Sequence, residues 1–398
     1  MHINENFLAL KNNYLFTEIE RKVNEYKKKN PDKSVIKLGI GDVSRPIPQI
    51  IIDEIKKAAD ELADIKTFRG YGPETGYDFL KQTILENEYA NLNIDISEIF
   101  ISDGIAADIG NVLELFDKNN SVSIIDPVYP EYLDTNIMDG RQITFIDCNA
   151  ENNFTPPLPN KKIDLIYICN PNNPTGTALN KTELKKWVDY AADNNSVILY
   201  DGAYEKFICS HDIPHSIFEI DNAKKCCIEF RSFSKFAGFT GLRCGYTVVP
   251  NELICKKSNT SLNKLWNRRQ STKTNGVSYI IQRAAQAVYI PHAKNECMAN
   301  IKYYMDNAKT IYNGLKESGY EVYGGIDAPY IWIKIADEFS CWEWFDVWLE
   351  NIGVVGTPGI GFGKNGERYF RLSAFGNAED TREAIDRIKN FSQAKKIF

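Results

Sequence analysis

The chain has 398 residues, a length that allows a large buried core and excludes a small metal finger or a disulfide-stapled mini-protein. Hydrophobic residues make up 43% and charged residues 25%, which is usual for globular proteins and excludes a disordered chain. The net charge is −6 and no apolar run approaches the roughly 18 residues of a membrane span, so we expect no nucleic acid and no membrane partner.

The nine cysteines form no Cys-x-x-Cys pair, and the histidines show no metal-ligand spacing, so we expect no metal site. The first residues lack the signature of a signal peptide. Both observations favour a cytoplasmic protein with reduced thiols.

In chain order, the sequence first predicts a helix over 17–29, a strand over 35–38 and a helix over 49–62. Short apolar runs then alternate with helical segments such as 181–194. The predicted strands are 99–101, 121–125, 142–146, 165–169, 197–200, 227–230 and 244–249. Because such runs are typical of strands buried on both faces, residues 40–290 are predicted to form an α/β domain with a mainly parallel central sheet.

Beyond residue 291 the pattern changes. It predicts a helix over 294–317, a strand over 331–335, a helix over 341–350, a strand over 369–373 and a helix over 378–391. We interpret 291–398 together with 1–39 as a smaller α+β domain built from both termini.

The most informative segment, 232–243, places Lys235 beside hydroxyls, glycines and an arginine. A lysine amine can form a Schiff base with an aldehyde cofactor. Ser232, Ser234 and Arg243 can hold a phosphate, the arginine through charge-assisted hydrogen bonds. A lone lysine in a polar loop would be the plainer interpretation, and the next two segments favour the cofactor.

Both of these segments follow predicted strands. Asp201 comes directly after the strand 197–200, and Tyr204 follows three residues later. Ligands of open α/β sheets bind outside the carboxyl ends of the strands, and an aspartate there can pair with a protonated pyridine nitrogen. The loop 170–176 contains two prolines and presents Asn173 as a hydrogen-bond donor. Taken alone, Asp201 would be explained as a helix cap and the loop 170–176 as a plain turn.

The motifs Asn-Pro-Thr-Gly, Asp-x-x-Tyr and Ser-x-Ser-Lys follow one another along the chain in this order, and an arginine lies downstream of the last. In this the chain resembles the fold type I pyridoxal 5′-phosphate enzymes, the aspartate aminotransferase superfamily. The resemblance implies a fold type I α/β architecture, a homodimer with shared active sites, and Lys235 as the catalytic lysine. The other cofactor contacts that it implies are Tyr71 from the neighbouring subunit, the backbone of Gly104, Ile105 and Ala106, and the side chains of Tyr129, Asn173, Asp201, Tyr204, Ser232, Ser234 and Arg243.

Longer motifs, over 68–76, 126–130, 357–363 and 370–376, are similar to those of the LL-diaminopimelate aminotransferases, and they span nearly the whole chain. This resemblance implies amino transfer between glutamate and tetrahydrodipicolinate in lysine biosynthesis. Arg371 would clamp the substrate α-carboxylate, because a guanidinium fork matches a carboxylate. The other substrate contacts that it implies are Tyr14, Ile40, Gly41, Glu74 of the partner chain, Tyr129, Asn173 and Asn275.

One position departs from that family. Its Ser-Asp-Gly-Ala-Lys-Cys-Asp pattern is Ser-Asp-Gly-Ile-Ala-Ala-Asp over 102–108 here, so Ala106 replaces a substrate-binding lysine. Two alternatives therefore stay open, a related aminotransferase with a different amino-acid substrate and a cofactor-dependent carbon–sulfur lyase. A sensor that keeps the fold without the activity is disfavoured, because Lys235 and Asp201 are retained and no added DNA-binding segment is expected. Lys273 is a candidate replacement for the missing cation.

Overall fold

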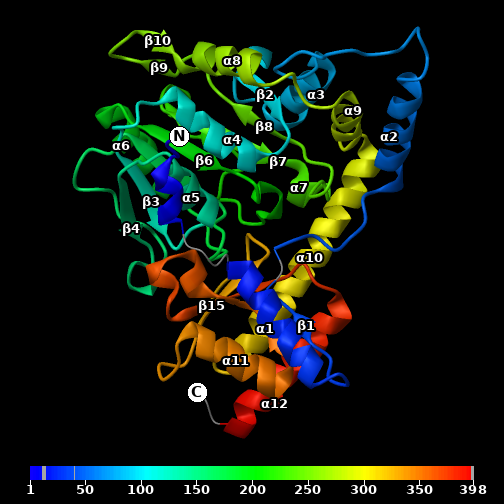
Figure 1. Cartoon of the computed structure of the whole chain (residues 1–398), viewed down its shortest axis with the longest axis vertical. Helices are drawn as coiled ribbons and strands as arrows, with labels where there is room; N and C mark the ends of the chain where they lie inside the picture. Colours follow the sequence, from blue (N-terminus) through cyan, green and yellow to red (C-terminus); the bar gives the residue numbers. More distant parts are fainter. Residues whose placement is uncertain (11–14, 40, 396–398) are drawn as a thin grey trace.

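The structure is a computed structural model that describes residues 1–10, 15–39 and 41–395. Its larger part contains a seven-stranded sheet, and its smaller part contains a four-stranded sheet with α1, α11 and α12 near it (Figure 1). The long helix α10, Pro291–Glu317, runs from one part to the other (Figure 1).

The seven-stranded sheet confirms the predicted, mainly parallel architecture. Its strand order is β2-β8-β7-β6-β5-β3-β4. The strands are β2 Ile99–Ser102, β3 Val122–Asp126, β4 Ile143–Asp147, β5 Leu165–Cys169, β6 Val197–Asp201, β7 Cys227–Ser232 and β8 Gly245–Val248. Every neighbouring pair is parallel except the two that involve β8, which runs antiparallel to β2 and β7.

This topology brings the chemical segments to one edge of the sheet. Asp201, the last residue of β6, lies opposite Cys169, the last residue of β5. Gly245, the first residue of β8, pairs with Ser102 at the end of β2 and with Ser232 at the end of β7. The loops that follow β2, β5, β6 and β7 and the loop that precedes β8 therefore meet, as expected for a ligand site in an open α/β sheet.

The helices include all those predicted above, with small changes of bounds, and several that were not predicted. They are α1 Leu15–Lys29, α2 Gln49–Glu61, α3 Asp78–Glu88, α4 Ile105–Asn111, α5 Pro130–Met138, α6 Lys181–Asn194, α7 Phe233–Phe236, α8 Leu262–Lys273, α9 Tyr279–Ala287, α11 Cys341–Ile352 and α12 Ala378–Lys395. Side chains and backbone at both ends of the first turn form capping boxes at α6 and α11, which satisfy amides that have no partner inside the helix. Among the described residues, none of these helices is long and apolar enough to cross a bilayer.

The smaller sheet is antiparallel, in the order β11-β12-β15-β14. Its strands are β11 Val322–Gly324, β12 Tyr330–Lys334, β15 Tyr369–Ser373 and β14 Thr357–Pro358, while β1 Ile36–Lys37 pairs with β13 Val354–Val355 and β9 Ile254–Cys255 pairs with β10 Thr260–Ser261.

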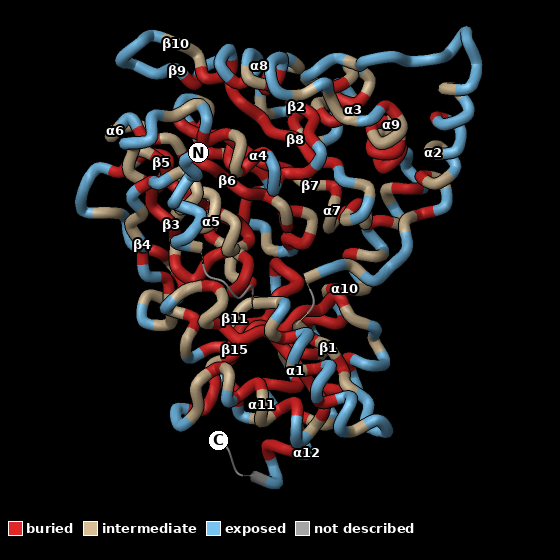
Figure 2. The backbone as a smooth tube through the Cα atoms, in the orientation of Figure 1, coloured by how far each residue is buried: buried red, intermediate tan, exposed pale blue. Residues whose placement is uncertain are grey.

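The buried residues follow the two sheets (Figure 2). One large hydrophobic cluster surrounds the seven-stranded sheet, and a second combines α1 and β1 with residues of α10, α11, α12 and the smaller sheet. Three aromatic residues of α11, Trp344, Phe345 and Trp348, are fully buried in this second cluster, and Trp342 packs against it partly buried, so they serve packing. The division of the chain at residues 40 and 290 into two domains stays a prediction.

Candidate active site

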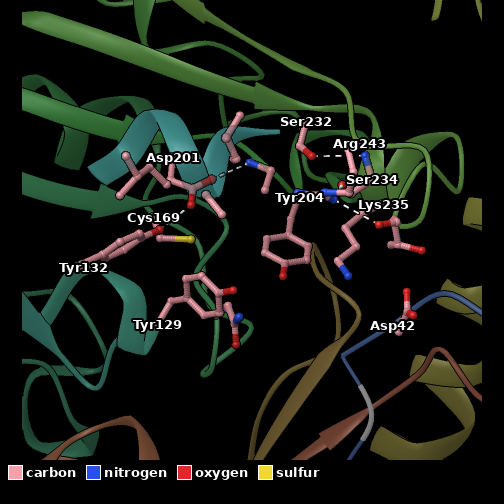
Figure 3. A pocket seen from close by; sticks show the side chains of 16 residues that line it. Asp42, Tyr129, Tyr132, Cys169, Asp201, Tyr204, Ser232, Ser234, Lys235 and Arg243 are labelled. Atoms are coloured by element: carbon pink, nitrogen blue, oxygen red, sulfur yellow. Dashed lines mark hydrogen bonds between the residues drawn. The ribbon is translucent and has the colours of Figure 1, made fainter. Parts of the chain in front are cut away.

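Two adjoining cavities lie where the strand ends meet the smaller part of the chain. The first encloses about 270 Å³ and the second about 390 Å³. Five residues line both: Asp42, Tyr129, Asn173, Tyr204 and Lys235. The structure thus gathers side chains from segments that are far apart in sequence around one space (Figure 3).

Lys235 lies on the single-turn helix α7, directly after β7, and its Nζ donates a hydrogen bond to the Gly41 carbonyl oxygen. Burial lowers its pKa to about 8, and the positive charges of Arg371 and Arg243 act in the same direction, while Asp42 opposes them. A lysine with such a pKa can lose its proton near neutral pH, which is what a nucleophile or general base needs.

Asp201 lines the first cavity and is only 6% exposed. Its carboxylate accepts hydrogen bonds from the Tyr132 hydroxyl and from the Ala203 amide at 2.9 Å. Burial raises the pKa of Asp201, because the charged form has lost its water. Both donors are neutral, so a cationic group of a ligand would stabilise this carboxylate.

A polar cradle lies on the other side of this cavity, formed by Ser232, Ser234 and Arg243 (Figure 3). The Arg243 guanidinium donates to the Thr240 carbonyl at 3.1 Å and to Ser234 Oγ at 3.5 Å. Arg243 has a φ of +61°, a left-handed conformation that is strained for a residue with a side chain and often marks a functional site.

Gly104 makes room for this guanidinium. Its φ is +117°, and a Cβ at this position would collide with Arg243 Nη2. Ile105 and Ala106, which follow it on α4, line the same cavity. A small anion such as a phosphate would therefore meet the guanidinium and two hydroxyls here.

Arg371 lines the second cavity and is 2% exposed. Its Nη1 donates to Asn173 Oδ1 at 2.8 Å and its Nη2 to the Gly39 carbonyl at 3.0 Å. The rings of Tyr330 and Phe362 each lie 4.6 Å from the guanidinium. A buried guanidinium that is held flat beside a cavity is suited to bind a carboxylate.

The sequence analysis missed several residues of the site, among them Tyr132, which donates to Asp201, and the two described next. Tyr330, the first residue of β12, places its hydroxyl 2.9 Å from that of Tyr204. Asp42 faces Lys235 (Figure 3) and lines both cavities. Asp42 ends the segment 39–42, which is similar to the family but was given no role in the site, and Tyr330 begins β12 and lies in no motif. Only the packing of the two parts of the chain reveals their place in the site.

Four predicted residues that the structure describes line neither cavity of this chain: Gly104, which is buried beside Arg243, and three that are exposed. Tyr71 is 91% exposed, and Glu74 and Asn275 are exposed as well. The loops of Glu74 and Asn275 touch each other, because a Cβ on Gly276 would lie 2.7 Å from the Pro73 carbonyl oxygen.

The other predicted positions include one that lines a cavity, two outside the described residues and one that is paired elsewhere. Gly41 lines the second cavity, whereas Tyr14 and Ile40 lie outside the described residues. Lys273 forms an ion pair with Glu114 at 2.8 Å and lines neither cavity, so within its own chain it does not replace the cation missing at Ala106.

Comparison with known proteins gives a consistent result. A family model described as aminotransferase class I and II matches residues 33–388. The LL-diaminopimelate aminotransferase of Methanosphaera stadtmanae is 53% identical over 97% of this chain and 98% of its own, and that of Bacteroides fragilis is 52% identical over 98% and 99%. The solved structure of L,L-diaminopimelate aminotransferase from Chlamydomonas reinhardtii is 40% identical, covers 98% of both chains and superposes with a TM-score of 0.93.

Proposed function

This chain belongs to the class I and II aminotransferases, and we propose that it is an LL-diaminopimelate aminotransferase that transfers an amino group between glutamate and tetrahydrodipicolinate. The observation that carries the proposal is identity above 50% to relatives of that name over nearly the whole chain. The partly buried Lys235 and the buried Asp201 and Arg371 around adjoining cavities support the same chemistry.

The proposal includes pyridoxal 5′-phosphate, and the donor set of the first cavity fits it. Asp201 offers a buried carboxylate to a protonated ring nitrogen, and Lys235 offers an amine to the aldehyde. The cradle of Ser232, Ser234 and Arg243, with the space that Gly104 leaves, suits the phosphate. When bound, this cofactor supplies an electron-withdrawing ring that stabilises negative charge at the substrate α-carbon.

In the proposed mechanism each residue has a separate task. Arg371 binds the α-carboxylate and fixes the substrate beside Lys235, whose Nζ takes the α-proton and holds it. Tyr129 would stack on the cofactor ring, while Asn173 and Tyr204 would contact its phenolic oxygen. Asn173 Oδ1 accepts from Arg371, so the amide nitrogen is the end that remains for this contact.

We also propose a homodimer with shared active sites. Tyr71 would reach the phosphate of the partner subunit's site, and Glu74 and Asn275 would meet the distal end of its substrate. Their exposure in a single chain, with Ile65 89% and Phe68 61% exposed on the same segment, fits a surface that a second copy covers. All nine cysteines are free thiols, which fits the cytoplasm as the proposed compartment.

Ala106 favours a second candidate, a related aminotransferase for another amino acid or a carbon–sulfur lyase. Ala106 lines the first cavity, where a lysine would add a positive charge. The variant Ala106→Lys tests its effect: it should raise kcat/KM for LL-diaminopimelate if the cation is needed, and leave it unchanged if the alanine is tolerated.

The function is tested by rapid mixing of the purified, cofactor-loaded protein with LL-diaminopimelate, glutamate, alanine or aromatic amino acids. Conversion of the cofactor's aldehyde-form absorbance to the amine form by LL-diaminopimelate and glutamate supports the proposal. Conversion by other amino acids alone discards this substrate, and release of pyruvate and ammonia without an oxo acid indicates a lyase. A protein that shows no cofactor absorbance contradicts the whole assignment.

A further inference from the structure

Tyr330 lies between the two halves of the active site, although no motif marks it. It is 1% exposed and begins β12 of the smaller sheet. On one side its ring lies 4.6 Å from the Arg371 guanidinium, and on the other its hydroxyl lies 2.9 Å from the Tyr204 hydroxyl. The residues that bind the α-carboxylate and those that face the cofactor are thus joined through one side chain.

The two hydroxyls form a buried pair in which one must donate and the other accept. Each tyrosine has one proton, so the direction of this bond decides where the remaining proton points. Burial raises the pKa of both tyrosines. The Arg371 guanidinium, which lies 4.6 Å from the Tyr330 ring, counteracts this rise at Tyr330, whereas the neighbouring Tyr330 adds to the rise at Tyr204. Tyr330 is therefore the better donor, and the Tyr204 proton is left for a different acceptor.

The surroundings hold Tyr330 in this position. Its ring packs edge-on against Tyr204, with centroids 5.2 Å apart at 73°, and against Phe375 at 6.0 Å and 83°. A Cβ on Gly41 would lie 3.4 Å from the Tyr330 hydroxyl oxygen, so the Gly41 backbone lies close to the hydroxyl where Tyr330 lines the second cavity. A tyrosine packed in this way cannot easily turn its hydroxyl elsewhere.

We propose that Tyr330 is a positioning residue: its ring supports the Arg371 guanidinium for the substrate carboxylate, and its hydroxyl donates to Tyr204, which directs the Tyr204 proton into the cofactor cavity. The inference rests on the proposed function, because it assumes a cofactor oxygen as the acceptor of that proton.

The two roles are separated by two variants of the holoenzyme. Tyr330→Phe keeps the ring and removes the donor, whereas Tyr330→Leu removes both. The first readout is the pH midpoint of the bound cofactor's visible absorbance, which reports how well its ring oxygen is stabilised as an anion. We expect Tyr330→Phe to raise this midpoint by about half a pH unit, in the same direction as Tyr204→Phe and by less.

The double variant Tyr204→Phe/Tyr330→Phe tests whether Tyr330 acts through Tyr204. Its midpoint should equal that of Tyr204→Phe alone. Additive shifts would overturn the proposal. A lower midpoint in Tyr330→Phe would also overturn the proposal. It would mean that Tyr204 donates to Tyr330 in the wild type, and that the Tyr204 proton turns toward the cofactor once the Tyr330 hydroxyl is removed.

The second readout is the dissociation constant of glutarate, a dicarboxylate that has no amino group to react. This constant should rise about tenfold in Tyr330→Leu and less than threefold in Tyr330→Phe, because only the leucine variant loses the ring beside the guanidinium. Equal affinity in wild type and Tyr330→Leu would overturn the support of Arg371.

Tyr320→Phe is the matched control, because the buried Tyr320 hydroxyl bonds Ser392 at 3.2 Å in the smaller part of the chain, away from both cavities. It should leave the midpoint and the glutarate affinity unchanged. Failure of the proposed function is distinguishable from failure of this inference, because it would appear in the wild-type protein as absent cofactor absorbance or absent amino transfer.

Discussion

The lowered pKa of Lys235 has a measurable effect on the stability of the cofactor-free protein. Below pH 8 the lysine is protonated in both the folded and the unfolded chain, and burial of the ammonium destabilises the fold. Between about pH 8 and the ordinary value of 10.5 the unfolded chain alone holds this proton. Because the unfolded state then binds more protons, the free energy of unfolding rises with pH in this window.

The gap between these two pKa values, at about 1.36 kcal/mol per pH unit, corresponds to roughly 3 kcal/mol. Lys235→Met has a side chain of similar size without the proton, and the other titrating groups cancel in the comparison. At pH 7 wild type should be less stable than Lys235→Met, and the difference should shrink as pH rises toward 10.5. The assay is urea unfolding of both cofactor-free proteins between pH 7 and 10.5.

A difference between the two proteins that stays constant across this range would refute the argument that burial lowers the pKa of Lys235. A companion variant, Asp42→Asn, removes a charge that opposes the shift. It should move the onset of the stability change to lower pH.

Three further predictions concern the cofactor cavity and its proposed partner. Gly104→Ala should weaken cofactor binding roughly 10- to 100-fold in equilibrium dialysis, because the new Cβ displaces the Arg243 guanidinium; Gly241→Ala, whose Cβ would meet nothing within 4 Å, should bind normally. Asp201→Asn should slow the half-reaction with glutamate by roughly 10²-fold or more while the melting temperature stays level or rises, because burial already disfavours the charged carboxyl; an unchanged rate would contradict its role at the ring nitrogen. Inactive Lys235→Ala and impaired Tyr71→Phe subunits, when mixed and refolded together, should regain activity, since each hybrid dimer contains one intact site; no recovery would argue against shared sites.

Much of the site could be predicted because parallel strands bring their carboxyl ends to one edge. Once the segments before Asn173, Asp201 and Lys235 were interpreted as strands of one sheet, the three side chains had to lie near one another. The positions of Tyr330 and Asp42 could not be found in this way. The Tyr204–Tyr330 hydrogen bond joins residues 126 positions apart, across the boundary between the two sheets, and neither strand pattern nor spacing encodes how those sheets pack.

The departure at Ala106 bears on the substrate and much less on the cofactor. The anion cradle depends on Arg243, Ser232 and Ser234, which lie around the β7–β8 connection, whereas residue 106 lies on α4 after β2. Loss of a cation on α4 leaves these contacts in place, and Asp201 and Lys235 also keep their surroundings. We therefore expect this chain to retain cofactor binding and amino transfer, and we expect Ala106, where the resemblance implies a substrate-binding lysine, to affect the choice of amino acceptor. The proposed amino transfer and the proposed substrate can therefore fail independently. The set of amino acids that converts the bound cofactor shows which of the two holds.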